Sequence, residues 1–207
     1  GTKSLNSYQN SLDCSAGSTD CKAVYYDNSD LYFVDCADST CTGSSTRTIL
    51  DGATNCYLTG CSTSQTSGAY NSLDCSQGAA NCQIGYQRNT DLYFADCADG
   101  ACGTGSTTTL LDGAAACSLT TGCDTNASTV YVDTDCSAAA DNCKVAYYTN
   151  QSNNNKDVWF GDCSNAGCTA GSTYNSDDSQ KTYLTAYLYT DSGAKVADGV
   201  TQTASSS

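Results

Sequence analysis

Cysteine and aspartate are the residue types in this chain whose chemistry could define a function. The 207 residues include 16 Cys and 22 acidic residues, all of them Asp, but no His. Nucleophilic catalysis by Ser or Cys normally needs a neighbouring base, most often His, so the absence of His strongly disfavours this class of mechanism. Structural zinc sites use more closely spaced Cys pairs or His partners. Pairs separated by four to six residues favour disulfides instead.

The cysteines recur with a period of 61 residues. Each complete copy contains a C-x6-C pair, a C-x4-C pair and a third pair, and the last copy lacks both members of the third pair. This joint loss is what local pairing predicts, because losing one member would leave an odd thiol. We therefore expect eight local disulfides, although spacing alone leaves other connectivities open. The expected pairs are Cys14–Cys21, Cys36–Cys41, Cys56–Cys61, Cys75–Cys82, Cys97–Cys102, Cys117–Cys123, Cys136–Cys143 and Cys163–Cys168.

The composition is typical of a secreted disulfide scaffold. Leu, Ile, Val and Phe number only 25, and the net charge is -14, which alone would indicate disorder. The high Cys content indicates instead a chain stabilised by bridges in an oxidising compartment, and we expect an extracellular or cell-surface protein. The absence of Met leads us to expect a mature chain whose signal peptide was removed. The acidity disfavours nucleic acid, and no apolar run is long enough for a transmembrane segment.

The cysteine period divides the chain into three repeats, at residues 1–61, 62–123 and 124–207, the last with a C-terminal strand extension. Turn-forming residues separate four β-rich segments in each complete copy. The expected strands are residues 7–13, 22–27, 31–36 and 46–52, then 69–74, 83–87, 92–97 and 107–113, then 129–135, 144–148 and 158–163. Five extra residues between Tyr148 and Asp157 indicate an exposed turn. The predicted fold is all-β and disulfide-rich, with three tandem four-stranded antiparallel repeats.

Carboxylates recur at two positions of every copy. They are Asp30, Asp91 and Asp157 where a strand starts, and Asp35, Asp96 and Asp162 directly before a Cys. Paired carboxylates could hydrolyse glycosides, but a residue present once per repeat indicates architecture, so we predict no catalytic residue. The first set is typical of tight turns. Calcium binding, with Asp177 and Asp178 as further ligands, is the alternative; otherwise we expect no cofactor and no metal.

The aromatic residues also follow the repeat. Phe33, Phe94 and Phe160 are equivalent, and so are Tyr32, Tyr93 and Trp159. Both faces of this strand carry apolar side chains, which favours packing between adjacent sheets. Tyr25, Tyr26, Tyr147 and Tyr148 are the more exposed aromatic candidates, since adjacent Tyr residues point to opposite faces. Aromatic rings that stack on sugars would make the protein a lectin.

The C-terminal segment departs from the repeat. In KTYLTAYLYTD, aliphatic side chains alternate with aromatic or hydroxyl side chains. This alternation predicts a long amphipathic strand. Such a strand either closes the chain's own sheet or pairs with another chain. The expected assembly residues are Tyr183, Leu184, Ala186, Tyr187, Leu188 and Tyr189.

Two N-x-S/T triplets, at Asn126 and Asn150, are predicted glycosylation sites.

The pattern YYDNSDLYFVDCADSTC…TRTILDG resembles the tandem repeats of certain secreted bacterial surface proteins. The resemblance implies a four-stranded, propeller-blade-like unit and carries no catalytic residues. This chain differs in having longer copies, an extra Cys pair and no Pro. Propellers usually have at least four blades, so three copies are also compatible with a β-trefoil, a β-prism or an open stack that neighbouring subunits complete.

These features together predict a non-enzymatic extracellular structural protein. It would form a homo-oligomer or filament, as a subunit of a surface fibre, sheath or adhesive layer assembled partly by β-strand pairing. The alternative is a secreted glycan-binding lectin.

Overall fold

A computed structural model describes residues 10–14, 20–36, 38, 40–41, 45–53, 55–78, 80–113, 128–136, 139, 141–150 and 156–175. The chain divides into two compact units, Gly1–Asn175 and Ser176–Ser207, and all described residues belong to the first. Every regular element among them is a β-strand, so the all-β prediction is confirmed.

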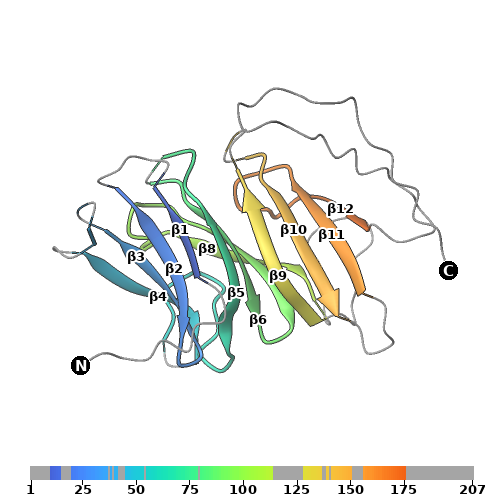
Figure 1. The fold of residues 1–207 in the computed structure, drawn as a ribbon, viewed down its shortest axis with the longest axis horizontal. Coiled ribbons are helices and arrows are strands. Elements are labelled where there is room, and N and C mark those ends of the chain that lie inside the picture. Colours follow the sequence, from blue (N-terminus) through green and yellow to red (C-terminus); the bar gives the residue numbers. More distant parts are fainter. Residues whose placement is uncertain are drawn as a thin grey trace. The chain divides into compact units, whose positions relative to one another are not determined.

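Twelve described strands form three antiparallel sheets in which neighbours in sequence are neighbours in space (Figure 1). Sheet 1 contains β1 (Asn10–Asp13), β2 (Lys22–Asp27), β3 (Asp30–Asp35) and β4 (Thr46–Gly52). Sheet 2 contains β5 (Ser67–Asp74), β6 (Gln83–Arg88), β7 (Asp91–Asp96) and β8 (Thr107–Asp112). Sheet 3 contains β9 (Ser128–Asp135), β10 (Lys144–Asn150), β11 (Lys156–Cys163) and β12 (Gly171–Asn175).

Short turns connect the two central strands of sheets 1 and 2. Asn28 and Ser29 join β2 to β3 with φ values of 53° and 76°, and Asn89 opens the β6–β7 turn with φ 54°. Two-residue hairpin turns need such left-handed backbone, which Asn adopts readily. The turn chemistry therefore fixes the pairing of the strand that carries the repeated Phe with the strand before it.

Sheet 3 differs from the expected third copy at two places. β10 and β11 extend to Asn150 and Lys156, so the hairpin is longer than the predicted strands 144–148 and 158–163. A fourth strand, β12, pairs with β11, with Phe160 opposite Tyr174. The sequence GSTYN lacks the apolar pattern of the equivalent segments in the other copies, and no strand was predicted there.

Each sheet has a front face and a rear face, which the strand register defines. Paired residues in neighbouring strands point to the same side. The front faces carry the aromatic pairs Tyr25–Tyr32, Tyr86–Tyr93 and Tyr147–Trp159. The rear faces carry Phe33, Phe94 and Phe160, which alternate with those residues along β3, β7 and β11.

Two hydrophobic clusters lie between consecutive sheets. In the first, Val24 and Phe33 from the rear of sheet 1 join Ile84 and Tyr86 from the front of sheet 2. In the second, Phe94 from the rear of sheet 2 joins residues from the front of sheet 3, among them Val145, Tyr147 and Trp159. The rear face of each sheet thus packs on the front face of the next. The predicted packing of the Phe-bearing strand between sheets holds at both interfaces.

Candidate functional site

Seven of the local Cys pairs that the spacing favours are disulfides in the structure, and the described residues include no free Cys. The remaining expected pair, Cys117–Cys123, lies outside the described residues. The C-x6-C bridges connect the end of the first strand of each sheet to the start of the second, as Cys14–Cys21 does between β1 and β2. The bridges therefore stabilise the corners of sheets whose apolar content is small.

An Asp or Asn two residues after the first Cys shapes the loops closed by Cys36–Cys41, Cys97–Cys102 and Cys163–Cys168. The backbone N–H groups of Cys41, Cys102 and Cys168 donate to the carbonyl oxygens of Asp38, Asp99 and Asn165, and all three Cys have positive φ, between 48° and 56°. The side chains of Asp38, Asp99 and Asn165 accept further backbone N–H bonds within the same loops. Sequence reasoning missed these residues, although their constant distance from the Cys was a usable signal.

The carboxylates before the second Cys pair are ion-pair and hydrogen-bond partners of β2, β6 and β10. Asp35 pairs with Lys22 and Asp162 with Lys144, each at 2.5 Å between Nζ and Oδ1. In sheet 2 the Lys is replaced by Gln83, whose Nε2 donates to Asp96 Oδ1 at 3.2 Å. Burial raises the pKa of Asp96, and the Gln83 hydrogen bond offsets this only in part. These three Asp residues lie in three separate sheets, so they do not form a carboxylate pair with one another.

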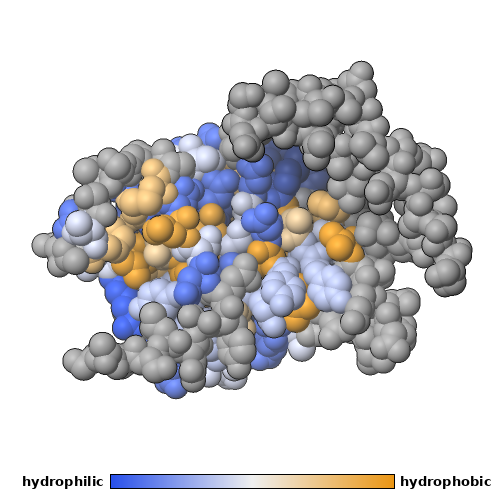
Figure 2. All heavy atoms as spheres, viewed as in Figure 1, coloured by the Kyte–Doolittle hydropathy of each residue, from blue (hydrophilic) through white to orange (hydrophobic). Residues whose placement is uncertain are grey.

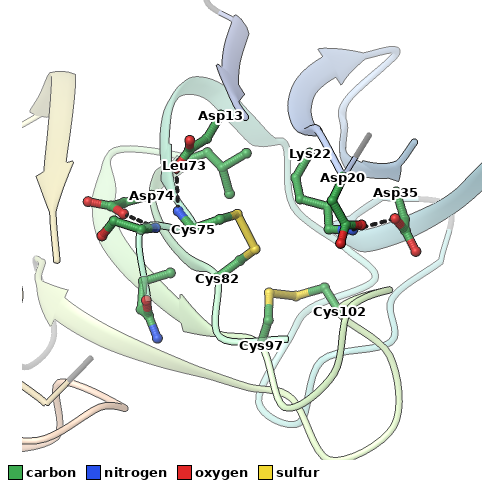
Figure 3. The surroundings of a disulfide bond; sticks show 12 residues. Asp13, Asp20, Lys22, Asp35, Leu73, Asp74, Cys75, Cys82, Cys97 and Cys102 are labelled. Carbon is green, nitrogen blue, oxygen red and sulfur yellow. Dashed lines mark hydrogen bonds and ion pairs between the residues drawn. A yellow bond between two sulfur atoms is a disulfide. The ribbon is translucent and has the colours of Figure 1, made fainter. Parts of the chain in front are cut away.

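Lys22 is buried, but its charge is compensated. Burial lowers the pKa of its ammonium, while hydrogen bonds to Asp35 and Asp20 and their charges raise it by more, so the net shift is upward. The two carboxylates therefore stabilise a buried cation at the point where β2 begins and β3 ends (Figure 3).

The Asp residues at the strand starts have a packing role. Asp30 is buried and lies against Gly52, where an added Cβ would overlap it, and Gly113 lies in the same way against Asp91. At both places the close approach of the Asp to the strand that follows is possible because Gly has no side chain. The side chain of Asp157 and the residues Asp177 and Asp178 are outside the description. Among described residues, no group of three Cys, His or acidic side chains could hold a metal ion.

The first strands of consecutive sheets are joined by one hydrogen-bond pattern that occurs twice. Asp13 Oδ2 accepts the backbone N–H of Cys75 at 2.5 Å (Figure 3). Asp74 Oδ2 accepts that of Cys136 at 2.6 Å. Two residues before each Asp, a Ser hydroxyl accepts a backbone N–H of the next sheet in the same way. The N–H of Leu73 donates to Ser11 Oγ, and that of Thr134 donates to Ser72 Oγ. Both junctions therefore use rear-facing side chains of one strand and the backbone of the next.

A second recurring contact links the last strand of one sheet to an aromatic residue of the next. Tyr86 donates to Asp51 Oδ2 at 2.7 Å, and Tyr147 donates to Asp112 Oδ2 at 2.7 Å. At the first interface Arg88 also donates to Asp51 Oδ2, at 2.9 Å. Burial, followed by the Asp51 charge, raises the pKa of Tyr86 well above its usual value, so the phenol stays a donor.

The aromatic residues separate into buried and accessible sets. Tyr147 and Trp159 are 2% and 6% exposed between sheets 2 and 3. The expectation that Tyr147 is an exposed aromatic residue is therefore wrong, whereas the expected packing of Trp159 between sheets is confirmed. Tyr25 and Tyr32 lie half-buried on the front of sheet 1, their ring centroids 5.3 Å apart. The Arg47 guanidinium lies 3.6 Å from the Tyr32 centroid. This aromatic arrangement is accessible to a ligand; Tyr26 and Tyr148 are half-buried on rear faces.

Of the predicted glycosylation and assembly residues, only Asn150 belongs to the part of the chain that the structure describes. Asn150 is the last residue of β10 rather than part of the predicted turn, and Asn126 lies outside the described residues. The tail residues from Tyr183 to Tyr189 are also outside them. In the described part of the chain, no helix has the length and hydrophobicity to span a membrane.

Comparison with known proteins gave no match to a family model, a curated protein or a solved structure.

Proposed function

We propose that this chain is a non-enzymatic structural protein of the extracellular surface, a subunit of a fibre, sheath or adhesive layer. The observation that carries the proposal is the repeated junction between sheets. Asp13 and Asp74 make equivalent bonds at the two junctions, and Asp51 and Asp112 make equivalent bonds to Tyr. The recurring reactive residue types are thus engaged in architecture. A unit that stacks by repetition is suited to building extended material.

The disulfides support an extracellular location, because short local bridges persist in oxidising compartments. On the chain-entropy relation a loop of this size contributes about 2 kcal/mol. Bridges at the sheet corners would let such material persist outside the cell with a small hydrophobic core. Strand pairing through Tyr183–Tyr189 remains part of the proposal as one route to contact between subunits.

Electron microscopy of the purified, unreduced chain over a wide concentration range tests the proposal, with native mass spectrometry beside it. We expect ordered oligomers or filaments that reduction of the disulfides disperses. A chain that stays monomeric at every concentration would refute the structural role.

A lectin is the second candidate, and the Tyr25–Tyr32–Arg47 group on the front of sheet 1 favours it. Stacked aromatic rings offer an apolar face to a sugar, and the partly exposed Arg47 offers donors to its hydroxyls. Glycan-array binding by the chain, lost in Tyr32→Ala and kept in Tyr57→Ala, would support this activity. Absence of binding to any glycan by the folded chain would exclude it.

A further inference from the structure

The two outermost sheet faces have buried counterparts inside the molecule. The rear faces of sheets 1 and 2 are each covered by the front face of the following sheet. The rear face of sheet 3 and the front face of sheet 1 carry the equivalent residues at the two ends of this series. Hydrophobic residues reach the surface over both sheet 1 and sheet 3 in the view of Figure 2.

Exposure at equivalent positions shows which faces are uncovered. On the rear faces, Leu31 and Leu92 are 0% exposed, whereas Val158, their counterpart in sheet 3, is 39% exposed. On the front faces, Leu73 of sheet 2 is 6% exposed, whereas its counterpart Leu12 in sheet 1 is 68% exposed. The same repeat position is therefore core inside the chain and surface at its ends.

A further large side chain follows the same rule. Tyr70 packs against the cluster between sheets 2 and 3, and its ring lies 5.1 Å from that of Tyr131. Tyr131 occupies the same place one repeat later and is 65% exposed. Apolar groups that are exposed at positions buried elsewhere in the same fold indicate a contact surface.

The hydrogen-bonding groups of the internal junction also recur on these two faces. Asp133 and Asp135 of β9 hold the register positions of Ser72 and Asp74 and are exposed. The backbone N–H groups of Leu12 and Cys14 hold the positions of Leu73 and Cys75, which donate to the preceding sheet. Asp133 already accepts bonds from Ser72 Oγ and the backbone of Thr134, and a carboxylate has room for another donor.

We propose that the rear face of sheet 3 binds the front face of sheet 1 of a second copy of this chain. This contact repeats the internal arrangement, with Val158 covered by the sheet that carries Leu12, Tyr25 and Tyr32. It rests on the proposed assembly function and gives it a partner and a geometry. Because the two faces are different, the contact is heterologous and continues head to tail, as a filament or, if the rotation closes, a ring.

Single charged substitutions on each face make the inference testable. Leu12→Asp disables the front face and leaves the rear face intact, whereas Val158→Asp does the reverse. Both residues are exposed in the monomer, so each variant should fold, which intact-mass analysis of the disulfides and circular dichroism verify. A charge buried without a partner should raise the dissociation constant by at least about 100-fold. Tyr57→Asp, at a loop residue that is 61% exposed, is the matched control.

The expected results in sedimentation velocity are distinctive. Each face variant alone should be monomeric under conditions where the wild-type chain and Tyr57→Asp assemble. An equimolar mixture of the two face variants should form dimers and stop there, because each dimer ends in two disabled faces.

Other outcomes overturn the inference in recognisable ways. Assembly of both face variants at wild-type strength would exclude this contact while leaving the proposed structural function standing, for example through the tail. Dimers formed by one variant alone would show a symmetric contact and refute the head-to-tail arrangement. A wild-type chain that never assembles would remove both proposals together.

Discussion

The contact between Asp51 and Arg88 allows the sharpest test of how the sheets are held together. Asp51 is fully buried and accepts hydrogen bonds from Tyr86, Arg88 and the backbone N–H of Ser62. Asp51→Ala would leave the guanidinium of Arg88, whose side chain is 7% exposed, buried without its carboxylate. Breaking a buried ion pair in this way costs about 3–5 kcal/mol. We expect a loss of that size in the free energy of unfolding.

The second interface supplies the matched control. Asp112 receives the equivalent Tyr147 bond, but a fully buried Thr149 stands where sheet 2 has Arg88, so no guanidinium is left behind. Asp112→Ala should therefore cost only about 1–3 kcal/mol. Urea unfolding of the unreduced proteins, with the denaturant slope checked for constancy, measures both values. Equal losses in the two variants, or a loss below about 1 kcal/mol for Asp51→Ala, would refute the role given to the buried ion pair.

Four further predictions concern sheet 2 and one of its bridges. Gln83→Lys should restore the ion pair of the other two sheets and stabilise the fold at pH 7 by about 1 kcal/mol, measured by urea unfolding; no gain would contradict it. Because burial raises the folded-state pKa of Asp96, its favourable contribution is fully present below the unfolded pKa and is lost as pH rises through the folded one. Asp96→Asn should accordingly stabilise the protein at neutral pH and lose this advantage in acid, which unfolding at both pH values checks. Gly85→Val should place atoms into two side chains of β9 and lower stability by about 1–3 kcal/mol; thermal unfolding at unchanged temperature would disprove the close packing. Replacing Cys97 and Cys102 together by Ala should lower stability by about 2 kcal/mol, and an unchanged urea midpoint would show that this loop needs no bridge.

Local spacing carried most of the fold information in this sequence. For each Cys, the nearest Cys along the chain is the other member of its own pair. Local bridges could therefore be predicted from the spacing and from the joint loss of one pair. Alternating apolar residues and turn residues such as Asn28 and Asn89 located the central strands. β12 was not predicted because GSTYN has no strong pattern of its own; pairing with β11 makes it a strand. Tertiary context overrides weak local preference in such segments.

The junctions between sheets could not be predicted for a different reason. The bonded pairs Asp13–Cys75 and Asp74–Cys136 are separated by 62 residues, one more than the repeat period. The offset is one residue because the Asp side chain of one copy accepts the backbone N–H of the Cys that directly follows the equivalent Asp in the next copy. Nothing in the composition distinguishes these Asp residues from those that close loops. Only the stacking of sheets shows which carboxylates act between repeats.

The same stacking explains how a chain so poor in aliphatic residues keeps a core. Sheet 2 is covered on both faces, and every side chain of β6 is buried. In sheets 1 and 3, Leu12 and Val158 hold positions that are buried in sheet 2. They are exposed because, among the described strands, each of these two sheets has a neighbouring sheet on one side only. Each added sheet buries two faces, its own and that of its neighbour, so stability per repeat rises with the length of the stack. Association between chains would gain apolar burial at the two end faces by the same interaction that already joins the sheets within one chain.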